Sequence, residues 1–223
     1  MNLAEISLSN EPQKYGPLKG QCCVKPGSHI KGTFFLGGAG LNGTYIPKLI
    51  KAFHEAGIKS AIYLDREKWS VGQNMDASIG VFFGRDYDPR FPMLLRLHNN
   101  SYQQFNLVGY SYGSFIAAQL AAKYARKGSR VDHLVLIGSP ISERFLKILK
   151  GMETIKNIVV INLDKYGDPI YAGIGMLELV SKARELHQQM QESDGHFYYA
   201  EEGIVGDKRR KDLAHKLYQL GLR

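Results

Sequence analysis

The sequence predicts an α/β protein whose mostly parallel sheet is doubly wound, with helices on both faces. Short runs rich in Val, Ile, Leu and Phe alternate with helical stretches of roughly ten to fifteen residues, a pattern that is typical of βαβ units. The 223 residues, 44% of them hydrophobic, suffice for one substantial core and are few for two. A Gly-x-Ser-x-Gly sequence, Gly109–Gly113, lies where a strand should pass into a helix. We therefore expect one domain over residues 1–223.

The predicted strands are short apolar runs in which β-branched and aromatic residues are enriched. They cover residues 32–36, 60–65, 105–108, 131–138 and 155–163. An additional strand is expected over residues 21–25. It follows a polar segment, residues 1–20, that contains two prolines and is predicted to be an irregular arm.

The predicted helices have apolar residues at helical spacing or an Ala-rich composition. They cover residues 46–56, 142–150, 174–191 and 207–220, together with the Ala-rich run that follows Gly113. Pro47 is tolerated in the first turn of the first helix, and Gly57 ends that helix. Residues 66–103 have no clear pattern beyond a helical piece around residues 93–98, and we expect this segment to cover a pocket.

The chain is basic, with a formal net charge of +8. Part of the excess lies in Lys208–Lys211, at the start of the last predicted helix. We interpret this cluster as a solvated helix face that can also contact an anionic membrane surface. Few aromatic residues accompany the cluster, so nucleic acid is not expected as a partner.

Composition also bears on location and on cysteine chemistry. The chain has no run of about 18 apolar residues that could span a membrane. Residues 1–20 contain no apolar core of a signal peptide, so we expect a cytoplasmic protein or one exported without a signal peptide. Cys22 and Cys23 are adjacent, and a bridge between neighbours is strained. Neither a structural disulfide nor a metal site is therefore expected from this pair.

The segment 104–125, QFNLVGYSYGSFIAAQLAAKYA, contains the strongest chemical signal. An apolar strand must reverse into a helix at Gly109–Gly113, and the glycines remove the Cβ atoms that would clash in such a turn. Ser111 is thereby exposed at a helix N-terminus, where backbone N–H groups and the helix dipole favour developing negative charge. Ser111 is our candidate nucleophile.

A serine hydroxyl needs a base and a group that orients the base. Asp168 lies in a turn bounded by glycine and proline just after the predicted strand 155–163, where the site of a doubly wound sheet is expected. Asp164, nearer the strand, is the second candidate for the acid. His196 lies in a loop and follows a glycine, whereas most of the other histidines fall in predicted helices or strands. The chain order is therefore Ser111, Asp168, His196.

These residues resemble the α/β-hydrolase superfamily, in which nucleophile, acid and histidine follow in that order. The resemblance covers the chain from about Gly32 onwards, and the short chain implies that no large cap domain is present. It implies that the backbone N–H of Tyr112 contributes to an oxyanion hole, with a second donor from Gly38 or Ala39 in the turn after strand 32–36. No metal or organic cofactor is implied. The sequence departs from the family in one respect, since no strand is evident directly before His196.

Two other functional classes remain open. Residues 38–43 form a Gly-x-Gly-x-x-Gly pattern, and Asp65 ends the next strand, which is the spacing of a dinucleotide-binding fingerprint. The same turn could equally supply a backbone N–H to an oxyanion hole. Nucleotide binding would also assign no function to Ser111, Asp168 and His196. A non-catalytic binding module of the same fold is the other alternative.

The leading hypothesis is therefore a serine hydrolase that cleaves a carboxylic ester or thioester through an acyl-enzyme. Apolar and aromatic residues in 69–95, together with the basic surface, favour a lipid or acyl-chain substrate. The sequence does not indicate an oligomeric state.

Overall fold

The computed structural model describes residues 30–38, 44–64, 86–87, 95, 102–182, 189 and 195–223. The N-terminal arm, the strand expected at 21–25 with its two cysteines, and most of residues 66–103 lie outside the described residues, so those predictions stay predictions.

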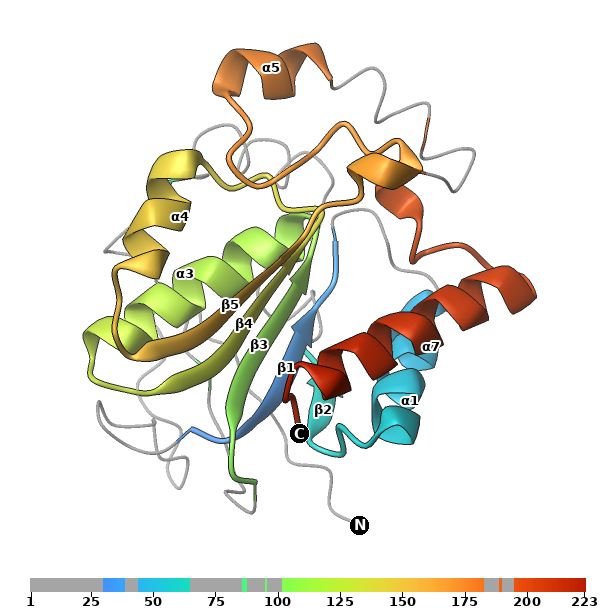
Figure 1. Cartoon of the computed structure of the whole chain (residues 1–223), viewed down its shortest axis with the longest axis horizontal. Helices are drawn as coiled ribbons and strands as arrows, with labels where there is room; N and C mark the ends of the chain where they lie inside the picture. The colour runs from blue at the N-terminus through green and yellow to red at the C-terminus, as the bar shows by residue number, and fades with distance from the viewer. Residues whose placement is uncertain are drawn as a thin grey trace, which may run out of the picture.

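A parallel five-stranded sheet forms the centre of the described structure, in the order β2-β1-β3-β4-β5 (Figure 1). The strands are β1 (Gly32–Leu36), β2 (Ala61–Tyr63), β3 (Phe105–Tyr110), β4 (Val131–Ile137) and β5 (Ile155–Ile161). The strand order reverses between β1 and β3, and ligand sites in such sheets lie beyond the carboxyl ends of the strands at this switch point. The register aligns Leu36, Gly109 and Leu136 across three strands, so β1, β3 and β4 end close together.

Helices cover both faces of the sheet, as the sequence predicts. Figure 1 shows α3 (Tyr112–Arg126) and α4 (Glu143–Lys150) on one face and α1 (Tyr45–Ala56) and α7 (Gly203–Gln219) on the other. Each face has its own apolar core, because successive strand residues point to opposite sides of the sheet. Leu107 and Leu134 pack into the core beneath α3 and α4, whereas Val108 and Val135 pack into the core beneath α1 and α7.

The helix α3 is buried along nearly its whole length, and its Ala-rich composition allows this. Small side chains let it lie close to the sheet, while its outer side receives residues from the segment before β3. The side-chain amide of Gln119 donates to the carbonyl of Asp86 at 2.7 Å, and Tyr124 Oη accepts the N–H of Leu95 at 2.8 Å. Asp86 and Leu95, from the segment 66–103, therefore lie against α3.

Two predicted helices have different boundaries in the structure. The helix predicted over residues 174–191 is wrong as one continuous element: α5 (Met176–Ser181) ends in a turn at Lys182, and only Leu179 of its six residues is buried. Residues 183–188 lie outside the described structure. The last helix begins at Gly203 rather than near residue 207. Gly203 and Gly206 lower the helical propensity of its first turn, and the sequence therefore did not predict that turn as helical.

The prediction that Lys208–Lys211 is a solvated helix face is wrong for one of its residues. Arg210 is only 1% exposed, and its guanidinium donates to the carbonyls of Tyr199 and Glu201 at 2.9 and 2.6 Å. It also pairs with the carboxylate of Asp207 at 2.6 Å. Arg210 therefore holds the chain that leads into α7, a task that charge counting alone does not reveal.

None of the helices within the described ranges is both long and apolar enough to cross a lipid bilayer.

Candidate active site

Ser111 occupies the sharp turn between β3 and α3. Its φ of 55° and ψ of −127° are unfavourable for a residue with a side chain, and among the described residues it is the one non-glycine with a positive φ. The turn is held from both sides. The N–H of Ser111 donates to the carbonyl of Ile137 in β4 at 2.8 Å, and its carbonyl accepts the N–H of Ser114 at 2.9 Å. This strained, over-determined geometry is that of a nucleophile elbow.

Close backbone contacts explain the two glycines of the motif. A Cβ atom on Gly109 would lie 2.3 Å from the Cα of Ser114, and one on Gly113 would lie 2.2 Å from the carbonyl oxygen of Leu36. Backbone atoms cannot rotate away from such contacts as a flexible side chain can. The Gly-x-Ser-x-Gly spacing therefore reflects the tight packing of β1, the elbow and α3.

Asp168 lies beyond the carboxyl end of β5, after a short 3-10 turn, η2 (Asp164–Tyr166). Its side chain is fully buried, and its Oδ1 accepts the N–H of Ile170 at 2.8 Å. Gly167, with a φ of +86°, turns the chain inward at this point. Asp164, the second candidate, is exposed instead. The structure therefore brings Asp168 into the site.

His196 connects the serine to this acid. It lies in a second 3-10 turn, η3 (Gly195–Phe197), and its side chain is only 6% exposed. Its Nε2 is 2.6 Å from Ser111 Oγ, and its Nδ1 is 2.9 Å from Asp168 Oδ2 and 3.0 Å from Oδ1. An ionised carboxylate only accepts hydrogen bonds, so Nδ1 carries the proton and Nε2 is free to accept one from the serine. The three residues singled out in the sequence thus form one hydrogen-bonded row.

Two side chains that sequence reasoning missed hold the backbone of His196. Tyr110, at the end of β3, donates its hydroxyl to the carbonyl of His196. Burial raises the pKa of Tyr110 well above its ordinary value, so its hydroxyl stays protonated and remains a donor. Gln189 accepts the N–H of His196 at 3.0 Å and donates to the carbonyl of Gly167 at 2.7 Å. Gln189 therefore ties the turn of the acid to the turn of the histidine.

Gly138, directly after β4, forms a bare backbone surface beside this pair. Its φ is +50°, and a Cβ atom there would lie 3.1 Å from Asp168 Oδ2 and 3.3 Å from the ring of His196. A side chain at this position would press on both groups. No sequence motif marks Gly138, because its role depends on two residues far along the chain.

The turn after β1 lies against the first turn of α3, as an oxyanion hole requires. The carbonyls of Leu36 and Gly37 are the atoms that a Cβ on Gly113 would meet, at 2.2 and 2.4 Å. Gly38 is buried and is the last described residue of this turn, whereas Ala39 lies outside the described residues. Tyr112 is the first residue of α3, and the first N–H groups of a helix have no acceptor within the helix itself.

The residues of the dinucleotide fingerprint are mostly not described: Gly40, Gly43 and Asp65 lie outside the described ranges. Within those ranges, no group of three or more His, Cys, Asp or Glu side chains is arranged to hold a metal ion.

A family model described as the alpha/beta hydrolase fold matches residues 93–168. The match runs through the elbow and ends at Asp168. Over this part of the chain, the match supports the α/β-hydrolase superfamily. This confirms the resemblance inferred from the elbow sequence and the order of the candidate residues. Neither the curated proteins nor the solved structures contain a match to the chain.

His196 lies beyond the matched segment. The described residues contain no strand between β5 and His196, but residues 190–194, directly before the histidine, lie outside the described residues. Among the described residues, the histidine is held by the 3-10 turn and by the side chains of Tyr110 and Gln189.

Proposed function

We propose that the protein is a serine hydrolase that cleaves a carboxylic ester or thioester through an acyl-enzyme. The observation that carries the proposal is the hydrogen-bonded row in which Ser111 Oγ lies 2.6 Å from His196 Nε2 and His196 Nδ1 lies 2.9 Å from Asp168 Oδ2. Nucleophile, base and orienting acid are each within hydrogen-bonding reach of the next, the geometry that serine activation needs.

In the first half-reaction, Ser111 Oγ attacks the carbonyl carbon of the substrate while His196 Nε2 takes the hydroxyl proton. Asp168 accepts the hydrogen bond from Nδ1 and stabilises the imidazolium that forms. The tetrahedral intermediate then collapses: the bond from carbon to the leaving oxygen or sulfur breaks, and His196 returns the proton to the leaving group. The acyl group remains on Ser111 as an ester.

In the second half-reaction, water attacks the acyl-enzyme while His196 Nε2 accepts one of its protons. Collapse of the second tetrahedral intermediate releases the carboxylic acid and returns the proton to Ser111. In both intermediates the carbonyl oxygen is negatively charged. We assign its stabilisation to the backbone N–H of Tyr112 and to a donor from Gly38 or Ala39, each worth about 2.7–4 kcal/mol in comparable sites.

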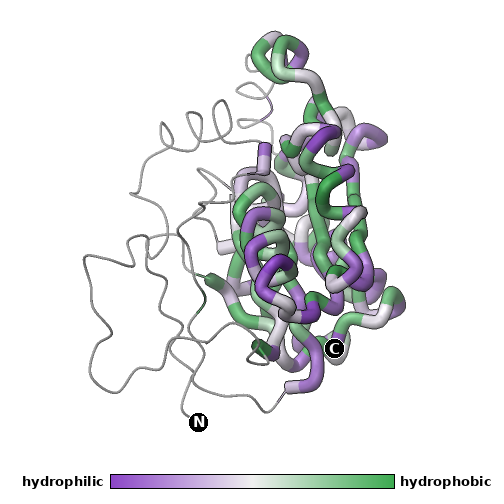
Figure 2. The backbone as a smooth tube through the Cα atoms, turned by 90° about the vertical axis from the view of Figure 1, so that its left-hand side faces the viewer, coloured by the Kyte–Doolittle hydropathy of each residue, from purple (hydrophilic) through white to green (hydrophobic). Residues whose placement is uncertain are grey.

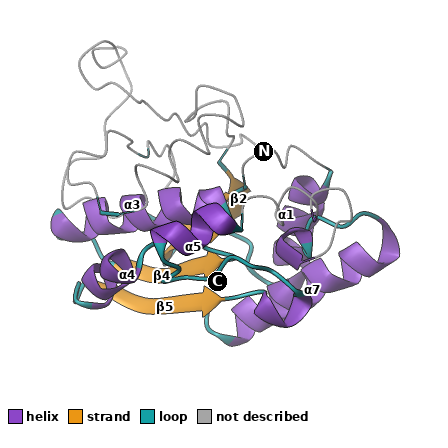
Figure 3. Ribbon diagram, turned by 90° about the horizontal axis from the view of Figure 1, so that it is seen from above, coloured by secondary structure: helices purple, strands orange, loops and turns teal. Residues whose placement is uncertain are grey.

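A lipid or acyl-chain substrate is supported by the apolar surface near the carboxyl edge of the sheet. Figures 1 and 3 show α5 lying over this edge, and Figure 2 shows its hydrophobic colouring at the top of the molecule. Met176, Leu177 and Val180 of α5 are 40, 87 and 43% exposed. Exposed apolar side chains grouped on one short helix are typical of a surface that meets an apolar ligand. Peripheral contact with an anionic membrane, favoured by the charge of +8, fits the same substrate class.

The two alternatives explain less of the site. Dinucleotide binding at residues 38–43 would not explain why Asp168 and His196 form a buried hydrogen-bonded pair. A non-catalytic module would not require Ser111 to occupy a strained backbone conformation, which costs of order 1–3 kcal/mol. Both the strain and the buried pair have a use in an acyl-transfer enzyme.

The proposal is tested by hydrolysis of p-nitrophenyl esters of increasing acyl-chain length. Ser111→Ala and His196→Ala should each lower kcat by about 10⁴-fold or more, because these groups act as a unit. Ser129→Ala, which changes a buried serine outside the site, serves as the matched control and should retain activity. A rise of kcat/KM with chain length supports an acyl-chain substrate. Turnover that survives in Ser111→Ala contradicts the proposal.

A further inference from the structure

The turns that carry Asp168 and His196 meet a second time, outside the hydrogen-bonded row. Tyr166, two residues before the acid, and Tyr198, two residues after the histidine, stack face to face with ring centroids 3.6 Å apart and planes 13° apart. Tyr166 and Asp168 belong to one segment of the chain and His196 and Tyr198 to another, so this contact joins the two turns directly.

A cation caps each side of the tyrosine pair. The ammonium of Lys165 lies 4.6 Å from the ring centroid of Tyr166, and the guanidinium of Arg209 lies 3.9 Å from that of Tyr198. Cations are attracted to the faces of aromatic rings, so the four side chains form a continuous stack. We refer to Lys165, Tyr166, Tyr198 and Arg209 as the aromatic stack.

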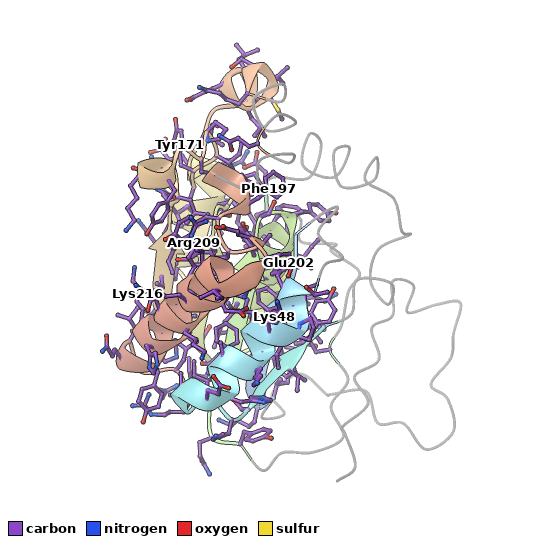
Figure 4. All side chains as sticks on the ribbon, turned by 90° about the vertical axis from the view of Figure 1, so that its right-hand side faces the viewer. Lys48, Tyr171, Phe197, Glu202, Arg209 and Lys216 are labelled. Atoms are coloured by element: carbon purple, nitrogen blue, oxygen red, sulfur yellow. The ribbon has the colours of Figure 1, made fainter. Side chains whose placement is uncertain are left out.

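The aromatic stack is anchored at its Arg209 end to α7. Arg209 donates to the carbonyl of Tyr198 at 3.2 Å and pairs with the carboxylate of Glu201. Figure 4 shows Arg209 on α7 beside the turn that contains Phe197. The ring of Tyr198 also meets that of Tyr199 edge to face, with centroids 5.0 Å apart. The turn of the histidine is therefore attached to a long helix, and through Tyr166 the turn of the acid is attached to the same helix.

The rings border a polar cavity of about 390 Å³ that is lined by residues of β5 and α7. Tyr166 and Tyr198 are only half-buried. They pack at the margin of the apolar core beneath α1 and α7, so replacing one ring would not open a closed void. The stack therefore does more to fix the two turns relative to each other than to hold the fold.

Such fixing is needed in this chain. Both Asp168 and His196 lie in or beside short 3-10 turns, and the described residues contain no strand between β5 and His196. A residue in a strand is aligned by the hydrogen bonds of the sheet, whereas Asp168 and His196 lie in or beside 3-10 turns, where side-chain contacts contribute to the alignment. Productive geometry in catalytic sites is held to within about 0.5 Å by such supporting contacts.

We propose that the aromatic stack is a positioning device that keeps Asp168 and His196 in hydrogen-bonding register. The inference rests on the proposed function, because register between acid and base matters only where His196 acts as a base. Lys165, Tyr166, Tyr198 and Arg209 are positioning residues; none of them belongs to the hydrogen-bonded row.

The test compares Tyr166→Leu, which removes the ring but keeps an apolar side chain, with Tyr166→Phe, which keeps the ring face. Tyr218→Leu is the matched control, because Tyr218 also lies under an arginine, Arg223, at 3.9 Å, and sits at the far end of α7. We expect Tyr166→Leu to lower kcat toward a p-nitrophenyl ester about tenfold with KM changed less than about twofold. Tyr166→Phe and Tyr218→Leu should stay within about twofold of the unmodified protein in both constants.

A second readout does not depend on turnover. The proton on His196 Nδ1, held by Asp168, should give a low-field proton resonance in NMR spectra of the unmodified protein. We expect Tyr166→Leu to weaken or shift this resonance, whereas Tyr166→Phe and Tyr218→Leu preserve it. An unchanged resonance and an unchanged kcat in Tyr166→Leu would overturn the inference, and so would an equal loss in Tyr218→Leu. If the unmodified protein hydrolyses no ester and yet Tyr166→Leu alone alters the resonance, the proposed function fails and the positioning role stands.

Discussion

Replacement of Gly113 by alanine should disable the site while leaving the fold in place. The added Cβ would lie 2.2 Å from the carbonyl oxygen of Leu36 and 2.4 Å from that of Gly37. Ordinary van der Waals contact begins near 3.4 Å, so β1 and the start of α3 must separate by about 1.2 Å. Since both acceptor atoms are backbone, the displacement falls on the elbow and on the turn after β1.

The expected effects on rate and on stability differ in size. A misplacement of about 1 Å can lower the rate about 10²-fold. The displacement caused by Gly113→Ala would move Ser111 and the backbone N–H of Tyr112 away from the turn after β1. Overpacking costs about 1–3 kcal/mol in the free energy of unfolding. Alanine in a helix regains up to about 1 kcal/mol over glycine, so the net loss of stability should be about 2 kcal/mol or less.

The assay is hydrolysis of a p-nitrophenyl ester together with urea unfolding of the same preparations. Gly151→Ala is the matched control, because Gly151 has a φ of −81° and its added Cβ would meet no atom closer than 3.5 Å. We expect Gly151→Ala to retain full activity and stability. A folded Gly113→Ala protein with unchanged kcat/KM would refute the assignment of this packing to the catalytic geometry.

Two further predictions concern the histidine support and the pH dependence of stability. Gln189→Ala removes both hydrogen bonds that tie the turn of Asp168 to His196, and it should lower kcat about tenfold at nearly unchanged Tm. The control Gln219→Ala, at an exposed position, should leave kcat unchanged. Equal kcat in the two variants would contradict this role of Gln189. Burial lowers the pKa of His133, so the unfolded state binds a proton first as pH falls. The contribution of neutral His133 to the free energy of unfolding is therefore complete above its unfolded pKa of about 6.5. It is lost as pH falls toward the lower pKa of the folded state. Urea unfolding at about pH 7.5 and pH 5 should therefore show a smaller acid loss in His133→Gln than in the unmodified protein, and equal losses would contradict the burial argument.

Much of the architecture could be predicted because its signals are local. The five strands are apolar runs long enough to be recognised one at a time, and Gly109–Gly113 combines a motif with a strand before it and a helix after it. The position of Asp168 followed from the same reasoning, since carboxyl ends of parallel strands meet at one edge of the sheet. His196 could be chosen because most other histidines fell within predicted regular elements.

The residues that support the site could not be predicted, because their roles depend on contacts between distant segments. Gln189 bonds to residues 22 positions before it and 7 positions after it, and nothing in its neighbourhood marks it. Arg210 appeared as one member of a basic run, yet its guanidinium is buried against backbone carbonyls. The helix predicted over 174–191 is interrupted after α5, a short helix that buries a single residue and so gains little from packing.

The most direct test of the central claim is to locate the site of covalent labelling by a fluorophosphonate, using intact-mass and peptide mass spectrometry. If Ser111 is an activated nucleophile, one equivalent of probe should add to the folded protein and map to Ser111, with no addition to Ser111→Ala. His196→Ala should label far more slowly, because its serine lacks a base. Folded protein that takes up no probe, or that carries the probe on another residue, would contradict the account.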